Sequence, residues 1–169
     1  MKIHVLYVED DKGDSDMIKE ASCVSTEEGV CPIISVEVID HPHSLKRSLH
    51  HGIDLVLSDV CFPPDDQPML DSVLRIVKEW CDEHRDGAMI PVIAYTSYDK
   101  AALAYCIEMG NQFDGLYDIW DKSTACPEYV IWRIAGLALE FASKNPDRGM
   151  LRFLSELSRT QKIRPVAKL

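Results

Sequence analysis

The residues that decide the fold read IDLVLSDV, from Ile53 to Val60, and two prolines follow at Pro63 and Pro64. The middle of this stretch is continuously apolar, without the alternation of polar and apolar residues that marks a half-exposed strand. A short apolar run bounded by turn-forming residues is typical of a strand covered on both faces, as in a parallel sheet. Runs of the same kind span residues 3–8 and 90–96, so three buried strands are predicted.

Two weaker β-prone runs and five helical patterns complete this arrangement. The β-prone runs span 33–39 and 115–120, and the helical patterns span 14–24, 44–50, 70–80, 101–109 and 127–142. Strand and helix patterns alternate five times, which predicts an α/β fold with a doubly wound, five-stranded parallel sheet. We expect the flavodoxin-like strand order 2-1-3-4-5. Gly110 is expected to end the fourth helix.

Length and charge predict one domain followed by an extension. With 169 residues, 46% of them hydrophobic, the chain has the size of one domain with a substantial core. Residues 1–143 hold 11 basic and 26 acidic residues, whereas residues 144–169 hold 7 basic and 2 acidic residues. We therefore expect one domain over 1–143 and a basic extension over 144–169, with an extra helix over 147–159. The acidic body argues against nucleic-acid binding, because phosphate contacts need a basic surface.

The sequence also indicates where the protein resides. No apolar run approaches the roughly 18 residues of a transmembrane helix, and the first residues turn acidic without a long apolar segment. The six cysteines form no CxxC pair, which argues against the common zinc and redox motifs and is consistent with reduced thiols. We expect a cytoplasmic protein that makes no contact with a membrane.

Polar side chains follow four of the predicted strands at their carboxyl ends. Glu9 and Asp10 follow the first strand, Asp59 the third, Thr96 the fourth and Lys122 the fifth. With the expected strand order, these residues converge where ligands bind in doubly wound sheets. Neighbouring carboxylates repel each other by about 4 kcal/mol per pair at an effective dielectric constant near 20, and Mg²⁺ relieves such repulsion. The pattern therefore predicts a site that places a phosphoryl group on a carboxylate.

Four motifs carry a family resemblance. They are LYVEDD after the first strand, DLVLSDVCFP around the third, VIAYTS at the fourth and WDKS at the fifth. Together they resemble the receiver domain of two-component response regulators, in the CheY-like superfamily, over residues 1–143. The resemblance implies that Asp59 accepts a phosphoryl group from a histidine kinase or a phosphorelay.

The resemblance also implies roles for the neighbouring residues. Mg²⁺ is expected at Glu9, Asp10 and Asp59, together with the backbone carbonyl of Cys61. Thr96 and Lys122 are expected to hold the phosphoryl oxygens. The partners implied are a histidine kinase or phosphotransfer protein, and a downstream protein target or a second copy of the chain. The protein is not expected to be an enzyme beyond self-phosphorylation from small donors and slow self-dephosphorylation. Self-dephosphorylation is expected to be slow because Cys61 and Tyr98 supply no acid or amide to orient water.

Departures from the family pattern keep two alternatives open. Ser123 stands where proline is usual after the lysine, and Ile119 stands at the position of an aromatic residue. These changes favour a degenerate receiver that acts as a phosphorylation-independent interaction module. A small hydrolase on the same topology ranks last, because Cys61 replaces the second acid of aspartyl phosphatases. In addition, Asp10 and Asp11 could simply cap the first helix.

Overall fold

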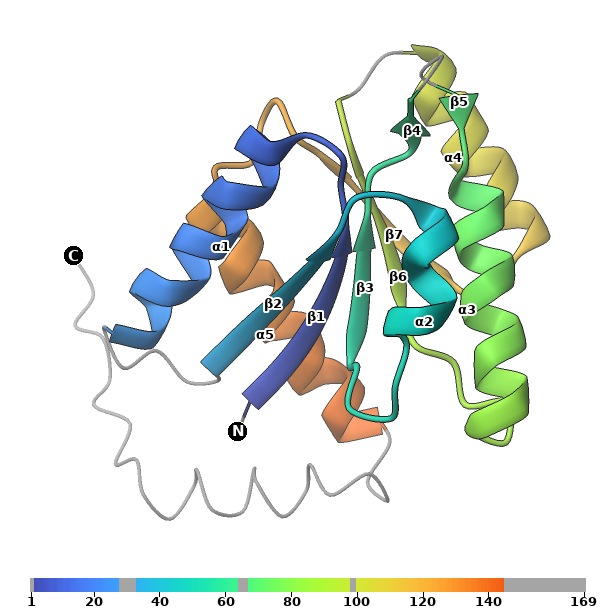
Figure 1. The fold of residues 1–169 in the computed structure, drawn as a ribbon, viewed down its shortest axis with the longest axis horizontal. Coiled ribbons are helices and arrows are strands. Elements are labelled where there is room, and N and C mark those ends of the chain that lie inside the picture. The colour runs from blue at the N-terminus through green and yellow to red at the C-terminus, as the bar shows by residue number, and fades with distance from the viewer. Residues whose placement is uncertain (1, 28–32, 64–66, 98–99, 145–169) are drawn as a thin grey trace.

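The computed structural model describes residues 2–27, 33–63, 67–97 and 100–144. Five strands form one parallel sheet in the order β2-β1-β3-β6-β7 (Figure 1). Their bounds are β1 Lys2–Val8, β2 Ile33–Ile39, β3 Leu55–Ser58, β6 Val92–Thr96 and β7 Leu116–Asp121. The predicted α/β class, the doubly wound sheet and the strand order 2-1-3-4-5 are confirmed.

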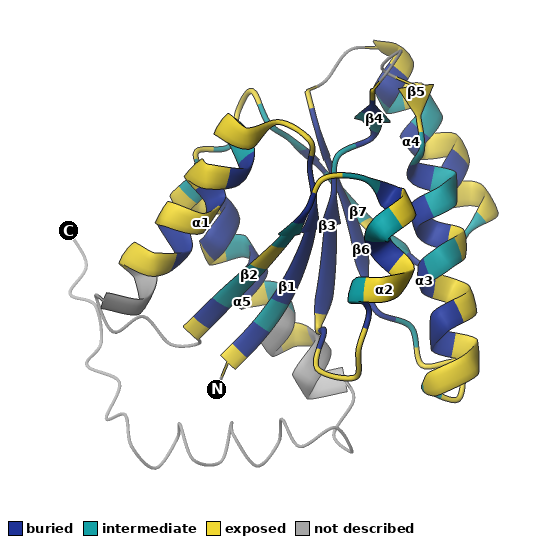
Figure 2. Cartoon of the chain, viewed as in Figure 1, coloured by how far each residue is buried: buried dark blue, intermediate teal, exposed yellow. Residues whose placement is uncertain are grey.

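Helices cover both faces of the sheet. One face carries α1 (Lys12–Glu27) and α5 (Pro127–Lys144), and the other carries η1 (Pro42–Ser44), α2 (Leu45–Ser48), α3 (Leu70–His84) and α4 (Lys100–Gln112) (Figure 1). Each face has its own core: Tyr7 and Trp120 are buried on the α1/α5 side, and Leu6 and Phe62 on the other. The strands β3 and β6 are buried along their whole length, as predicted for strands covered on both faces (Figure 2).

Two local features differ from the prediction. The loop after Asp59 contains a short antiparallel pair, β4 (Cys61–Phe62) with β5 (Gln67–Pro68), which the sequence did not indicate. The expectation that Gly110 ends the fourth helix is wrong, because α4 continues to Gln112. Gly110 lacks the positive φ with which a glycine ends a helix, and a Cβ atom on it would make an ordinary contact, 3.4 Å from the side chain of Leu116.

Some predictions fall on residues outside the described part of the chain. These are the extension 145–169 with its helix over 147–159, and Tyr98 in the loop after β6. Among the described helices, none combines the length and the apolar composition that crossing a membrane requires. All five described cysteines are free thiols.

Candidate functional site

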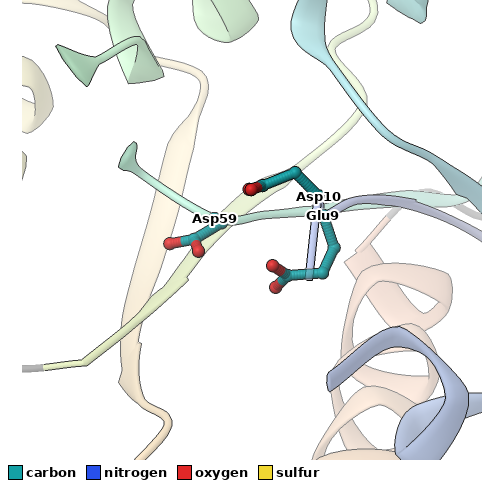
Figure 3. Close-up of side chains that lie close together, drawn as sticks. All are labelled: Glu9, Asp10 and Asp59. Atoms are coloured by element: carbon teal, nitrogen blue, oxygen red, sulfur yellow. The ribbon is translucent and has the colours of Figure 1, made fainter. Parts of the chain in front are cut away.

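The pairing of β1 with β3 brings the predicted acids together. Val8 lies opposite Ser58, and the backbone N–H of Asp59 donates to the carbonyl of Val8 at 2.9 Å. Both strands therefore end at the same edge of the sheet, where Glu9 and Asp10 follow β1 and Asp59 follows β3. Carboxylate oxygens of these three residues all lie within 4.8 Å of one another (Figure 3).

Lys122 completes this cluster from the end of β7. Its Nζ donates to Glu9 Oε2 at 2.5 Å, to Asp59 Oδ2 at 2.8 Å and to Asp14 Oδ2 at 3.0 Å. An ammonium group has three donors, so each N–H has a carboxylate acceptor. Only 11% of the Lys122 side chain is exposed. Burial lowers the pKa of Lys122, but the charges and hydrogen bonds of Asp59 and Glu9 raise it more, so the group stays protonated.

Glu9 is a buried carboxylate with three donors. Its side chain is 0% exposed. Besides Lys122, Oε2 accepts from the Tyr7 hydroxyl at 2.6 Å, and Oε1 accepts from the backbone N–H of Asp11 at 3.1 Å. Burial raises the pKa of Glu9, against the lowering effect of the bonds from Lys122 and Tyr7. Burial and the Glu9 charge also raise the pKa of Tyr7, so Tyr7 remains a donor.

The donor chemistry of the site suits a metal ion. Glu9 is buried, Asp59 is half-buried and Asp10 is exposed, so the group opens to solvent on one side. Burial and the neighbouring charge of Asp59 raise the pKa of Asp10. Carboxylate oxygens are the ligands that hard divalent cations such as Mg²⁺ prefer. The three carboxylates can therefore hold a metal ion.

The two acids after Glu9 have different roles. Asp11 caps α1, because its Oδ1 accepts from the backbone N–H of Asp14 at 3.0 Å and its carbonyl accepts from Ser15. Asp10 lies in the acidic cluster with Asp59. The capping alternative is thus correct for Asp11, whereas Asp10 occupies the place that the family resemblance gives it.

Thr96 and Cys61 lie at the same edge of the sheet. Thr96 is buried, it ends β6 opposite Asp121, and its carbonyl accepts from the backbone N–H of Lys122 at 3.0 Å. Cys61 is half-buried in β4, against the core on the α3 and α4 side. The predicted contacts of the Thr96 hydroxyl with phosphoryl oxygens and of the Cys61 carbonyl with a metal stay predictions.

Two residues of the site were not predicted. Tyr7 precedes Glu9 by two residues, a spacing that places two side chains on the same side of an extended chain, and the Tyr7 hydroxyl donates to Glu9. Asp14 follows the cap Asp11 by three residues and reaches Lys122 from the first turn of α1. The spacing of Tyr7 and Glu9 is a signal that the sequence offered. The contact of Asp14 is not visible in the sequence, because Asp14 lies inside a helical pattern and not at the end of a predicted strand.

Comparisons with known proteins bear on the fold. No protein-family model matches the sequence, and no curated protein matches it. The isolated receiver domain of RcsB from Salmonella enterica serovar Typhimurium, solved with the phosphomimetic BeF₃⁻, has a TM-score of 0.50 at 16% identity, over 81% of this chain and 88% of that chain. A longer Salmonella typhimurium RcsB response regulator gives 0.51 at 16% identity, over 80% of this chain but only 59% of that chain.

A third similar structure is a yeast Spc42 trimeric coiled-coil segment fused to another structure. Its TM-score is 0.59 at 17% identity, over 94% of this chain and 91% of that chain. At identities this low, the structural similarity shows a shared fold and nothing beyond it. The fold is receiver-like.

Proposed function

We propose that this chain is a signalling receiver that accepts a phosphoryl group on Asp59 in a Mg²⁺-dependent two-component system. The observation that carries the proposal is the meeting of Glu9, Asp10, Asp59 and Lys122 at the carboxyl edge of a receiver-like sheet. The donor is a histidine kinase or a phosphotransfer protein. The output is a change in binding to a downstream protein or to a second copy, and not to nucleic acid, because the body is acidic.

The chemistry needs few groups beyond those at the edge. An ionised oxygen of Asp59 attacks the phosphorus of a phosphohistidine, and a new P–O bond forms. The P–N bond breaks, and its electron pair remains on the imidazole nitrogen of the donor. Lys122 and the Thr96 hydroxyl orient the phosphoryl oxygens and stabilise their charge. Glu9, Asp10, Asp59 and the Cys61 carbonyl would hold Mg²⁺, which would supply further positive charge to those oxygens.

Charge explains why a divalent cation is required. Glu9, Asp10, Asp14 and Asp59 supply four carboxylates against the single ammonium of Lys122. An incoming phosphoryl group adds more negative charge to this edge. Like charges about 4 Å apart repel by about 4 kcal/mol at an effective dielectric constant near 20. Without a cation, phosphoryl transfer to Asp59 is therefore disfavoured.

Mass spectrometry with a small phosphodonor tests the proposal. Phosphoramidate with Mg²⁺ should add one phosphoryl group to the wild-type protein and none to Asp59→Asn. Asp16→Asn is the matched control, because Asp16 is an exposed acid on α1 and should leave uptake unchanged. Excess chelator should abolish uptake. Modification that persists in Asp59→Asn or in chelator would contradict the proposal, as would an unmodified wild-type protein.

The position of Ile119 favours a second candidate function. In β7, an isoleucine stands where the family pattern has an aromatic residue. The Ile119 side chain is half-buried against the core on the α4 side. In the degenerate alternative, partner binding does not depend on phosphorylation. A wild-type protein that takes up no phosphoryl group but binds its partner would support this alternative.

A further inference from the structure

The ammonium group of Lys122 links three segments of the chain. Its acceptors are Glu9 after β1, Asp59 after β3 and Asp14 in the first turn of α1. All three N–H donors of Lys122 therefore have an acceptor before any phosphoryl group arrives. A phosphoryl oxygen that is to be held by Lys122 must take a donor from one of these carboxylates.

Helix capping places Asp14 where it can reach Lys122. The backbone N–H of Asp14 is bonded to the side chain of Asp11, which fixes the first turn of α1. The carboxylate of Asp14 takes no part in this cap and accepts from Lys122 Nζ at 3.0 Å instead. Asp14 thus connects the start of α1 to the end of β7.

We propose that Asp14 is a positioning residue that shares Lys122 with Asp59 and gives it up when Asp59 is phosphorylated. This inference rests on the proposed function of the site. In the unphosphorylated state, Asp14 holds the ammonium group between the two strand ends. In the phosphorylated state, the phosphoryl oxygens replace Asp14 as the acceptor, and the first turn of α1 loses its tie to β7.

Burial decides which carboxylate is released. The Glu9 side chain is 0% exposed and the Asp59 side chain 15%, whereas 34% of the Asp14 side chain is exposed. If Lys122 left Glu9, the buried negative charge of Glu9 would lose its positive partner, and an unpaired buried charge destabilises a protein strongly. Water can solvate Asp14 once Lys122 has left, so the loss of this partly exposed ion pair costs little. The distances also indicate that Asp14 is the weaker acceptor, since Lys122 Nζ lies 2.5 Å from Glu9 Oε2 and 3.0 Å from Asp14 Oδ2.

Binding of beryllofluoride at saturating Mg²⁺ tests this inference. Asp14→Asn removes the competing charge, so it should bind beryllofluoride roughly two- to fivefold more tightly than the wild-type protein, the range of a partly exposed ion pair. Asp16→Asn removes the same charge from the same helix and should stay close to the wild-type affinity. Asp14→Glu restores a carboxylate and should return the affinity to the wild-type value.

Hydrogen exchange of α1 gives a second measurement. In the wild-type protein, beryllofluoride should speed exchange in the first two turns of α1. In Asp14→Asn, exchange there should be fast already and should not change on binding. Equal beryllofluoride affinities of Asp14→Asn and Asp16→Asn would overturn this inference but not the proposed function. The same holds if hydrogen exchange in wild-type α1 does not change when beryllofluoride binds. No binding by the wild-type protein or any variant would overturn the proposed function and this inference with it.

Discussion

Two cations at opposite edges of the sheet are each held by three oxygen atoms. At the carboxyl edge, Lys122 Nζ lies within 3.0 Å of three carboxylates. At the amino edge, Arg85 at the end of α3 holds the loop that precedes β3. Its Nη2 lies 2.7 Å from the carbonyl of His51, 2.8 Å from that of Ile53 and 3.5 Å from that of His50.

The difference lies in the acceptors. Backbone carbonyls are neutral and fixed by the chain, so the contact of Arg85 is structural, and its guanidinium also lies 5.3 Å from the centre of the Trp80 ring. Carboxylates are charged, and they can be protonated, bind a metal or accept a phosphoryl group. Similar coordination of a cation therefore gives a structural tie at one edge and a set of charged acceptors at the other.

Replacing Lys122 should have the largest effect. Lys122→Met removes the charge that compensates buried Glu9, so we expect a loss of about 3–5 kcal/mol in the free energy of unfolding at neutral pH. Burial already raises the pKa of Glu9, and loss of Lys122 raises it further. A carboxyl group with a raised pKa favours the folded state at low pH and loses this contribution as the pH rises. The deficit of the variant should therefore shrink between pH 8 and pH 5.

Urea unfolding across this pH range measures the effect. Lys78→Met is the matched control, because Lys78 is 58% exposed and lies 3.9 Å from Asp82 in a surface pair. It should change stability little at any pH. A deficit in Lys122→Met that is the same at pH 5 and pH 8 would show that Glu9 does not depend on Lys122.

At the other edge, Arg85→Ala should destabilise the protein without affecting the site. Two carbonyls at 2.7 and 2.8 Å lose a charged donor, which costs about 1.5–3 kcal/mol. Phosphoryl uptake and beryllofluoride binding should remain at wild-type levels. Arg75→Ala serves as the control, because Arg75 is exposed on the same helix. A loss of phosphoryl uptake in a folded Arg85→Ala protein would mean that the two edges are coupled.

The main elements of the fold were predictable because burial leaves a clear pattern in the sequence. Continuous apolar runs predicted β1, β3 and β6, and the alternation with helices predicted a doubly wound parallel sheet, for which the flavodoxin-like strand order was the expectation. The pair β4–β5 was missed because each strand has two residues, too few for any periodicity. The end of α4 was misplaced because the glycine at position 110 keeps helical backbone angles, and the sequence does not distinguish such a glycine from one that ends a helix.

The candidate site was predictable only where its residues stand at strand ends. Glu9, Asp10 and Asp59 follow apolar runs, Lys122 follows a weaker β-prone run, and the strand order brings the ends of these runs together. Asp14 lies inside a helical pattern, where an acid in the first turn is ordinarily explained by the helix dipole. Its contact with Lys122 depends on how α1 packs beside the end of β7, which no local pattern encodes.

Protons should compete with metal at the carboxyl edge. Burial raises the pKa of both Glu9 and Asp10, so these groups take up protons at a higher pH than ordinary carboxyl groups do. A metal binds the charged form, so Mg²⁺ affinity should fall as the pH falls toward 5. The fall approaches about tenfold per pH unit for each proton displaced, once the pH is below the raised pKa values. Calorimetric titrations at pH 7, 6, 5 and 4 measure it, and a fall in affinity that begins at no higher pH than for ordinary carboxyl groups would contradict the raised pKa values.

The smallest loss of stability is expected on replacing Arg133, a third cation. It pairs with one carboxylate and is partly exposed to solvent. Its Nη2 lies 2.8 Å from Asp118 Oδ2, and the two side chains are 37% and 38% exposed. The guanidinium also lies 4.3 Å from the centre of the Trp120 ring. Arg133→Met removes the charge but keeps an apolar side chain over the ring. We therefore expect a loss of at most about 1 kcal/mol in urea unfolding, with a smaller loss at high salt. If this loss equalled that of Lys122→Met, burial and the number of charged acceptors would not determine the effect of removing a cation in this fold.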